Sequence, residues 1–128
     1  MPAISFPEYA REIEDILNRM VVADEAILVN LRVDQRSIVR GLITGSLEFQ
    51  DGSTLHFREF VDISQTEPKI MYAYHYQDAG YNLIFRYDNA AHRPALPQPE
   101  HKHTPSTVET SSVPTLGGVL DQIIRQMA

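Results

Sequence analysis

The hydrophobic residues of this chain change their spacing near residue 25, and this change limits the fold more than any other feature. Upstream, an apolar stripe with the period of an α-helix is formed by Phe6, Tyr9, Ala10, Ile13, Ile16, Leu17 and Met20. Downstream, apolar residues alternate with smaller or polar ones, first at Ile27, Val29, Leu31 and Val33. A two-residue period is typical of strands in a half-buried sheet. The chain is therefore predicted to begin with a helix and to continue as a sheet.

Capping signals predict where two helices begin. Ser5 and Glu8 have the spacing of a capping box, in which the N-cap hydroxyl accepts a hydrogen bond from the first turn. Thr115 is placed to cap a second helix, whose apolar stripe is Leu116, Val119, Leu120, Ile123, Ile124 and Met127. We expect this C-terminal helix to pack on the sheet, although Gly117 and Gly118 weaken its first turn.

Short connections between the strands predict an antiparallel meander of about five strands. The register of one hairpin follows from its turn, which contains Asp51 and Gly52. A three-residue loop with Gly52 in the left-handed bulge position pairs Leu47 with Leu55 and keeps apolar residues on one face. The opposite face then carries Thr44, Ser46, Glu48, His56 and Arg58.

The next predicted hairpin, with its turn near residues 78–80, also separates aromatic from polar residues. Its aromatic face groups Tyr72, Tyr74, Tyr76, Leu83, Phe85 and Tyr87. Its other face receives Ala73, His75, Ile84 and Arg86. A continuous sheet would place this second set beside His56 and Arg58. The pairing across residues 64–69 decides this point, and the sequence leaves it open.

A long proline-rich loop is predicted for residues 89–113, which have no regular period and contain Pro94, Pro97, Pro99 and Pro105. The part through His103 is expected to lie ordered against the sheet. Residues 104–113 are expected to form a flexible linker before the last helix. With residues 1–128 in a single domain, the predicted fold class is α+β.

Composition narrows the class of protein. The chain has no cysteine, which excludes disulfides and thiolate chemistry. Its net charge of −6 argues against nonspecific coating of nucleic acid but leaves room for a small local anion site. No apolar run is long enough to span a bilayer, and the N-terminus lacks the features of a signal peptide. The sequence therefore predicts a cytoplasmic protein without membrane contact.

Glu59 is a first candidate for chemistry, because alternation places its carboxylate among the apolar residues of the strand LHFREFVDI. A carboxylate is costly to bury, so one reading is a general base or a carboxylate that orients an arginine. The other reading is that Glu59 accepts hydrogen bonds from tyrosine hydroxyls or lies at the rim of the sheet. Both readings stay open.

His75 and Arg86 belong to neighbouring predicted strands, where a shared face brings an imidazole beside a guanidinium. Arg86 can clamp a phosphate with two parallel hydrogen bonds, and Arg58 offers a second cation. Further candidates for contact with the same ligand are Tyr76, Tyr87, Asp88 and Asn89. The two tyrosines otherwise form part of a hydrophobic layer, and the last two residues otherwise form a turn.

All five histidines fall between His56 and His103. His101 and His103 would project to the same side of an extended segment, as pairs of metal ligands do. Their spacing matches no standard zinc motif, so we expect no metal and no other cofactor. Proton transfer or phosphate contact is instead considered for His92, His101, Lys102 and His103, beside plain surface positions.

Four segments taken in order, LHFREFVDI, YAYHYQDAG, NLIFRYDNAAH and HKH, resemble the signature blocks of the TumE family of prokaryotic toxins. The resemblance extends over roughly residues 25–127. It departs from the family motif DNAPHHP, because Asn89 is followed here by AAHRP. The resemblance implies a toxin encoded beside an antitoxin of the helix-turn-helix type, acting in a bacterial or archaeal cytoplasm.

Small toxins of comparable architecture often cleave RNA, so the leading hypothesis is a metal-independent endoribonuclease. The groups considered for it are His75, His92 or Glu59 as base, Arg58 and Arg86 for the charge on phosphorus, and His101 or His103 as acid. A second hypothesis is a noncatalytic protein whose sheet face binds a protein or a nucleotide. A third is a structural module whose polar face is a homodimer interface. A concave site with His75, Arg86 and His92 within hydrogen-bond reach would favour the nuclease.

Overall fold

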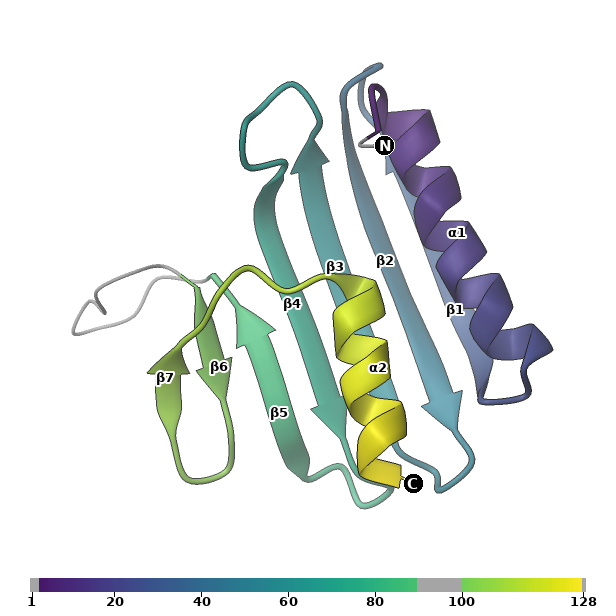
Figure 1. Cartoon of the computed structure of the whole chain (residues 1–128), viewed down its shortest axis with the longest axis vertical. Coiled ribbons are helices and arrows are strands. Elements are labelled where there is room, and N and C mark those ends of the chain that lie inside the picture. Colours follow the sequence, from purple (N-terminus) through teal and green to yellow (C-terminus); the bar gives the residue numbers. More distant parts are fainter. Residues whose placement is uncertain (1–2, 90–99, 128) are drawn as a thin grey trace.

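The computed structural model describes residues 3–89 and 100–127, and over these ranges it places two helices on one face of a seven-stranded antiparallel sheet (Figure 1). The helices are α1 (Phe6–Val22) and α2 (Leu116–Met127). The strands, which follow one another across the sheet in chain order, are β1 (Ala26–Gln35), β2 (Arg40–Phe49), β3 (Thr54–Asp62), β4 (Lys69–Gln77), β5 (Leu83–Asp88), β6 (His101–His103) and β7 (Val108–Thr110). The predicted α+β class and antiparallel meander are confirmed.

The predicted number of strands, about five, was wrong, because β6 and β7 extend the sheet beyond β5. Each of the two has only three residues, too few for an alternating pattern to stand out. A turn between Thr104 and Thr107 joins them, in which the Thr104 N–H donates to the Thr107 carbonyl at 2.9 Å. Strand β7 thus lies inside the segment 104–113 that was predicted as a linker, and its residues are exposed.

The predicted register of the β2–β3 hairpin is confirmed. Leu47 pairs with Leu55, and Gly45 pairs with Phe57. Gly52 has a φ of 84°, the left-handed conformation that the predicted bulge requires. The Phe49 N–H donates to the Ser53 carbonyl at 2.9 Å and closes the loop. The turn therefore fixes which residues of both strands face the helices.

Strands β3, β4 and β5 form one continuous sheet, which answers the question that residues 64–69 left open. Tyr74 pairs with Phe57 on one side and with Tyr87 on the other. His75 pairs with His56 and with Arg86 in the same way. The aromatic and polar residues of both hairpins therefore lie on opposite faces, as alternation predicted.

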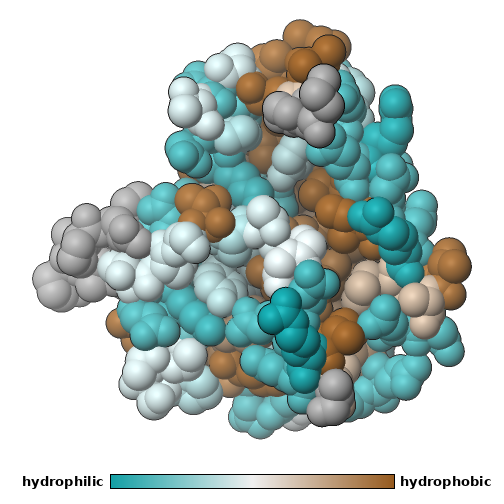
Figure 2. Space-filling model, in the orientation of Figure 1, coloured by the Kyte–Doolittle hydropathy of each residue, from teal (hydrophilic) through white to brown (hydrophobic). Residues whose placement is uncertain are grey.

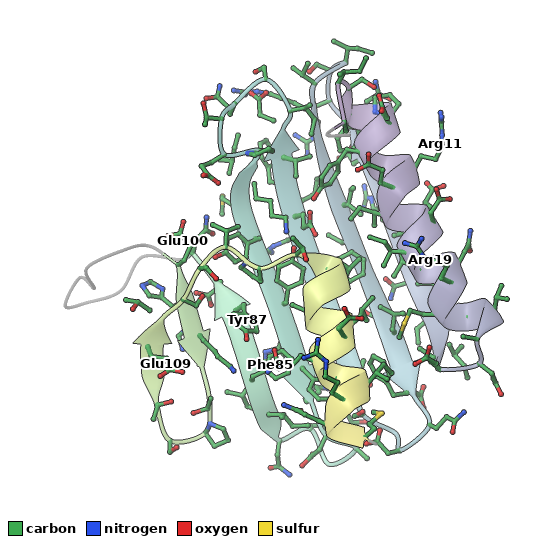
Figure 3. The ribbon with its side chains drawn as sticks, in the orientation of Figure 1. Arg11, Arg19, Phe85, Tyr87, Glu100 and Glu109 are labelled. Atoms are coloured by element: carbon green, nitrogen blue, oxygen red, sulfur yellow. The ribbon has the colours of Figure 1, made fainter. Side chains whose placement is uncertain are left out.

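Both helices lie on the aromatic face, called here the covered face. The Tyr9 hydroxyl of α1 donates to Glu59 on β3, and the Tyr87 hydroxyl of β5 donates to Gln122 of α2 at 3.0 Å. Figure 3 shows Phe85 and Tyr87 on β5, while Arg11 and Arg19 extend from the outer side of α1. From this side the surface is mixed, with hydrophilic residues spread between separate hydrophobic areas (Figure 2).

The helix caps agree with the predicted signals. The Glu8 N–H donates to the Ser5 hydroxyl at 3.3 Å, and the Gly118 N–H donates to the Thr115 hydroxyl at 3.0 Å. Between the helices and the sheet lies one core, whose least exposed apolar members include Phe6, Leu17, Ile43, Leu47, Leu55, Val61, Tyr74, Leu116 and Ile123. Within residues 3–89 and 100–127 no helix lies on the opposite face of the sheet, which is called here the open face.

Candidate functional site: a polar pocket on the open face

Strand register places polar residues in a row across the open face. The row, from β2 to β6, is Ser46, His56, His75, Arg86 and His103. A second row, two residues away along each strand, is Thr44, Arg58, Ala73, Asp88 and His101. Because paired residues on one face of antiparallel strands lie about 5 Å apart, each row forms a chain of neighbouring side chains.

A cavity of about 210 Å³, called here the sheet pocket, opens between these rows. It is lined by His56, Phe57, Arg58, Ala73, His75 and Arg86. Ala73 has the shortest side chain of the two rows, and the longer side chains of its neighbours rise around it. The pocket therefore depends on a small residue flanked by cations and imidazoles.

The two arginines of the sheet pocket differ in their partners. The Arg86 Nε atom donates to Asp88 Oδ2 at 2.8 Å, and its Nη1 atom lies 3.4 Å from His75 Nδ1. Arg58 is exposed and forms no ion pair or side-chain hydrogen bond with any residue in 3–89 or 100–127. An anion entering the pocket would meet one arginine already held by a carboxylate and one that is available to it.

The two histidines of the pocket differ in their burial and in their neighbours. Burial and the neighbouring Arg86 guanidinium lower the pKa of His75, so this imidazole is neutral at neutral pH. His56 is exposed, and its Nδ1 atom lies 2.8 Å from the Ser46 hydroxyl. The two ring centres are 6.5 Å apart. The pocket thus combines a neutral imidazole with a second, hydroxyl-bound imidazole one strand away.

Beside the pocket, Asp88, His101 and His103 form a compact cluster on the open face. The His101 Nδ1 atom lies 3.6 Å from Asp88 Oδ1, and the His103 Nε2 atom lies 3.4 Å from Asp88 Oδ2. Asp88 and His101 are buried, and His103 is half-buried. The predicted projection of both histidines to one side is confirmed, with Asp88 as their common neighbour.

Glu59 lies on the covered face, away from the sheet pocket. Its two carboxylate oxygens accept hydrogen bonds from Tyr9 and from Tyr74, the latter at 2.6 Å. The Lys69 ammonium lies 3.9 Å from the carboxylate and donates to the Tyr74 hydroxyl at 2.6 Å. Of the two readings of Glu59, the structure shows hydrogen bonds from tyrosine hydroxyls.

Other candidate residues are likewise distributed over both faces. Tyr76 bonds Ser53 at 2.8 Å on the covered face, where the Lys102 ammonium also lies over the rings of Phe85 and Tyr87. The Asn89 side chain bonds the backbone of β4, accepting from the Tyr72 N–H at 3.1 Å. These contacts are structural and lie apart from the sheet pocket. His92 lies outside the described residues.

His56 and Asp88 lie closer to the candidate site than their sequence positions predicted. His56 was placed on the polar face but was not included among the candidates, although the register of the hairpin was a sufficient signal. Asp88 was considered as a turn former or ligand contact, whereas it lies buried between Arg86 and two histidines. No sequence signal reveals the histidine contacts, since they depend on the pairing of β6 with β5.

Comparison with known protein families gives a match over most of the chain. The family described as Toxin TumE matches residues 10–128. No curated protein and no solved structure shows a significant match. Among the described residues, neither helix has the length and apolar character needed to cross a membrane.

Proposed function

We propose that this chain, which belongs to the TumE family of toxins, is an endoribonuclease that acts in the sheet pocket. Membership of this toxin family also implies a cognate antitoxin. The observation that carries the proposal is the arrangement of His75 between His56 and Arg86, with Arg58 beside it. This arrangement brings a neutral base, a second imidazole and two cations to one place. Acid–base groups and cations that stabilise the charge on phosphorus accelerate RNA cleavage through the ribose 2′-hydroxyl. We further propose a cytoplasmic site of action and an antitoxin of the helix-turn-helix type.

In the proposed reaction, His75 acts as the general base. Its Nδ1 atom faces Arg86 at 3.4 Å, a contact long enough to be given up when the guanidinium turns to a phosphate. The freed lone pair then accepts the proton of the ribose 2′-hydroxyl. The 2′-oxygen attacks phosphorus, and the bond to the 5′-oxygen breaks. The products are a 2′,3′-cyclic phosphate and a free 5′-hydroxyl.

His56 is the proposed general acid. The Ser46 hydroxyl holds its ring through Nδ1, so Nε2 is the atom that delivers a proton to the leaving 5′-oxygen. The 6.5 Å between the two ring centres lets one phosphate lie between base and acid. Arg58 and Arg86 stabilise the negative charge that builds on the phosphate oxygens in the transition state. Glu59 has no role in this reaction because it lies on the covered face.

A neighbouring apolar hollow supports RNA as the substrate. A second cavity of about 220 Å³ is lined by Leu42, Arg58, Phe60 and Met71, so it shares Arg58 with the sheet pocket. Phe60 is partly exposed there and offers an aromatic face to a base. Stacking on an aromatic side chain contributes about 1–3 kcal/mol per base without sequence preference. A phosphate at Arg58 and a base at Phe60 would therefore bind to neighbouring side chains on the open face of β3.

The test is expression in cells that lack the antitoxin, followed by sequencing of RNA ends. Wild-type protein is compared with His75→Gln and Arg58→Ala, and Arg19→Ala on the outer side of α1 is the matched arginine control. We expect growth arrest and new RNA ends with the wild type and the control, and neither with the two pocket variants. Growth arrest with intact RNA would contradict the nuclease and favour noncatalytic binding.

A further inference from the structure

The Asp88–His101–His103 cluster has the geometry of a metal site. Pairing of β5 with β6 places Asp88 opposite His101 and Arg86 opposite His103 on the open face. One nitrogen of each imidazole and one carboxylate oxygen of Asp88 all lie within 4.8 Å of one another. Three potential ligands from two strands therefore surround one small volume, next to the sheet pocket but outside its lining.

Each imidazole lies from one oxygen of Asp88 at a separation close to that between two ligands of a four-coordinate ion. Zinc bonds to nitrogen and oxygen are about 2.0–2.2 Å long, which places tetrahedral ligand atoms roughly 3.4 Å apart. The His103 Nε2 atom lies 3.4 Å from Asp88 Oδ2, and the His101 Nδ1 atom lies 3.6 Å from Asp88 Oδ1. The second distance is longer than a hydrogen bond.

The donor set selects the kind of ion. Two imidazoles and one carboxylate suit zinc and similar transition metals, whereas magnesium and calcium prefer oxygen ligands throughout. Three protein ligands leave a fourth position open. Asp88 is 5% exposed and His101 is 2% exposed, so two of the ligands are already shielded from water. From these features we infer that Asp88, His101 and His103 bind one Zn²⁺ ion.

Arg86 supplies the outer support that such sites use. Ligating carboxylates are held in place by further hydrogen bonds, and the Arg86 Nε atom donates to Asp88 at 2.8 Å. The ion would fasten the three-residue strand β6 to β5, a pairing that otherwise rests on few residues. It would also fix Asp88, and through it the position of Arg86 at the wall of the sheet pocket. The role inferred for zinc is therefore structural and leaves the acid–base chemistry of the pocket unchanged.

The test measures metal binding by the full chain without RNA. Chelator-treated protein is titrated with Zn²⁺ by calorimetry and with Co²⁺ by visible absorption, which reports coordination geometry. We expect one ion per chain and a four-coordinate cobalt spectrum for the wild type. His103→Gln, at the most exposed of the three ligands, should weaken zinc binding by about 100-fold or more, since even outer-shell changes cost about 10- to 100-fold.

His56→Gln, which removes an imidazole from the same face, is the matched control and should bind zinc as the wild type does. Circular dichroism establishes that each variant is folded before titration. The inference is overturned if the wild type takes up no zinc, if His103→Gln binds as tightly, or if His56→Gln loses binding equally. Because no RNA is present, these outcomes are independent of the proposed nuclease.

Discussion

Two neighbouring charged residues of β3 point to opposite faces of the sheet and differ in their burial and in their partners. On β3, Glu59 points to the covered face and is fully buried, while its neighbour Arg58 points to the open face and is exposed. Glu59 is matched by Tyr9, Tyr74 and Lys69. Arg58 has no such partners among the described residues. Adjacent residues of one strand thus separate a charge that serves the fold from a charge that is available to a ligand.

This difference shows that burial alone is a poor marker of function. Burial and the nearby carboxylate raise the pKa values of Tyr9 and Tyr74, so both hydroxyls remain donors to Glu59 at any physiological pH. The Lys69 ammonium also donates to the carbonyl of Pro114 at 2.6 Å, which ties the segment before α2 to the same network. A buried network whose donors and acceptors are matched stabilises the fold. An excess of cations beside imidazoles instead favours the binding of an anion.

The largest expected effect is on activity and comes from the open face. His75→Gln removes the proposed base while retaining a polar side chain, and should lower the RNA cleavage rate by about 10²- to 10⁴-fold. Its free energy of unfolding should change little, because His75 lies on the uncovered side. Single-turnover cleavage and urea unfolding measure the two quantities. If His75→Gln lost much stability but still cleaved RNA, the proposed functional role of the open face would be contradicted.

The covered face should show the opposite pattern. Glu59→Ala leaves Lys69 without its carboxylate and removes the acceptor of both tyrosine hydroxyls. We expect a loss of about 3–5 kcal/mol in the free energy of unfolding, measured with urea. Arg58→Ala on the same strand is the matched control and should change stability by about 0.5 kcal/mol or less. Equal losses for the two variants would mean that the faces are not distinct.

A smaller effect tests how closely α1 contacts the covered face. A Cβ atom at Gly41 on β2 would lie 2.1 Å from the ring of Phe6, which is itself fully buried. Gly41→Ala should therefore cost about 1–3 kcal/mol of stability in thermal or urea unfolding. Gly117→Ala is the control: no atom lies within 4 Å of its Cβ position, and alanine should stabilise α2 by roughly 0.5–1 kcal/mol.

The smallest expected effect is a shift in the pH dependence of the RNA cleavage rate. Because the pKa of His75 is lowered, its neutral form persists below the usual histidine value of about 6.5, and the acid limb of the cleavage rate should lie below that value. In the same window the unfolded chain binds more protons than the folded one, so stability falls slightly as pH decreases. Arg86→Gln removes a neighbouring charge and should move the acid limb upward. An acid limb above 6.5 in the wild type would contradict this role of His75.

The sequence predicted those features that depend on local patterns. Helix caps, the register set by Gly52 and the two-faced alternation of β3 to β5 follow from short segments, and all are confirmed. Strands β6 and β7 were missed because three residues carry no period, and their pairing depends on the rest of the sheet. The same limit applies to the site. His75 and Arg86 were expected to share a face, whereas the contacts of Asp88 with His101 and His103 require β6.

The strand order also has a consequence for how the chain folds. Since every strand pairs with its neighbour in the sequence, the sheet can form hairpin by hairpin. The helices also form contacts over longer separations, because the Tyr9–Glu59 bond joins residues 50 positions apart and the Tyr87–Gln122 bond joins residues 35 apart. During synthesis α1 is made before β1 and β2, against which it packs, and before Glu59 on β3. Its apolar stripe therefore has no sheet to pack against until β1 and β2 have been made.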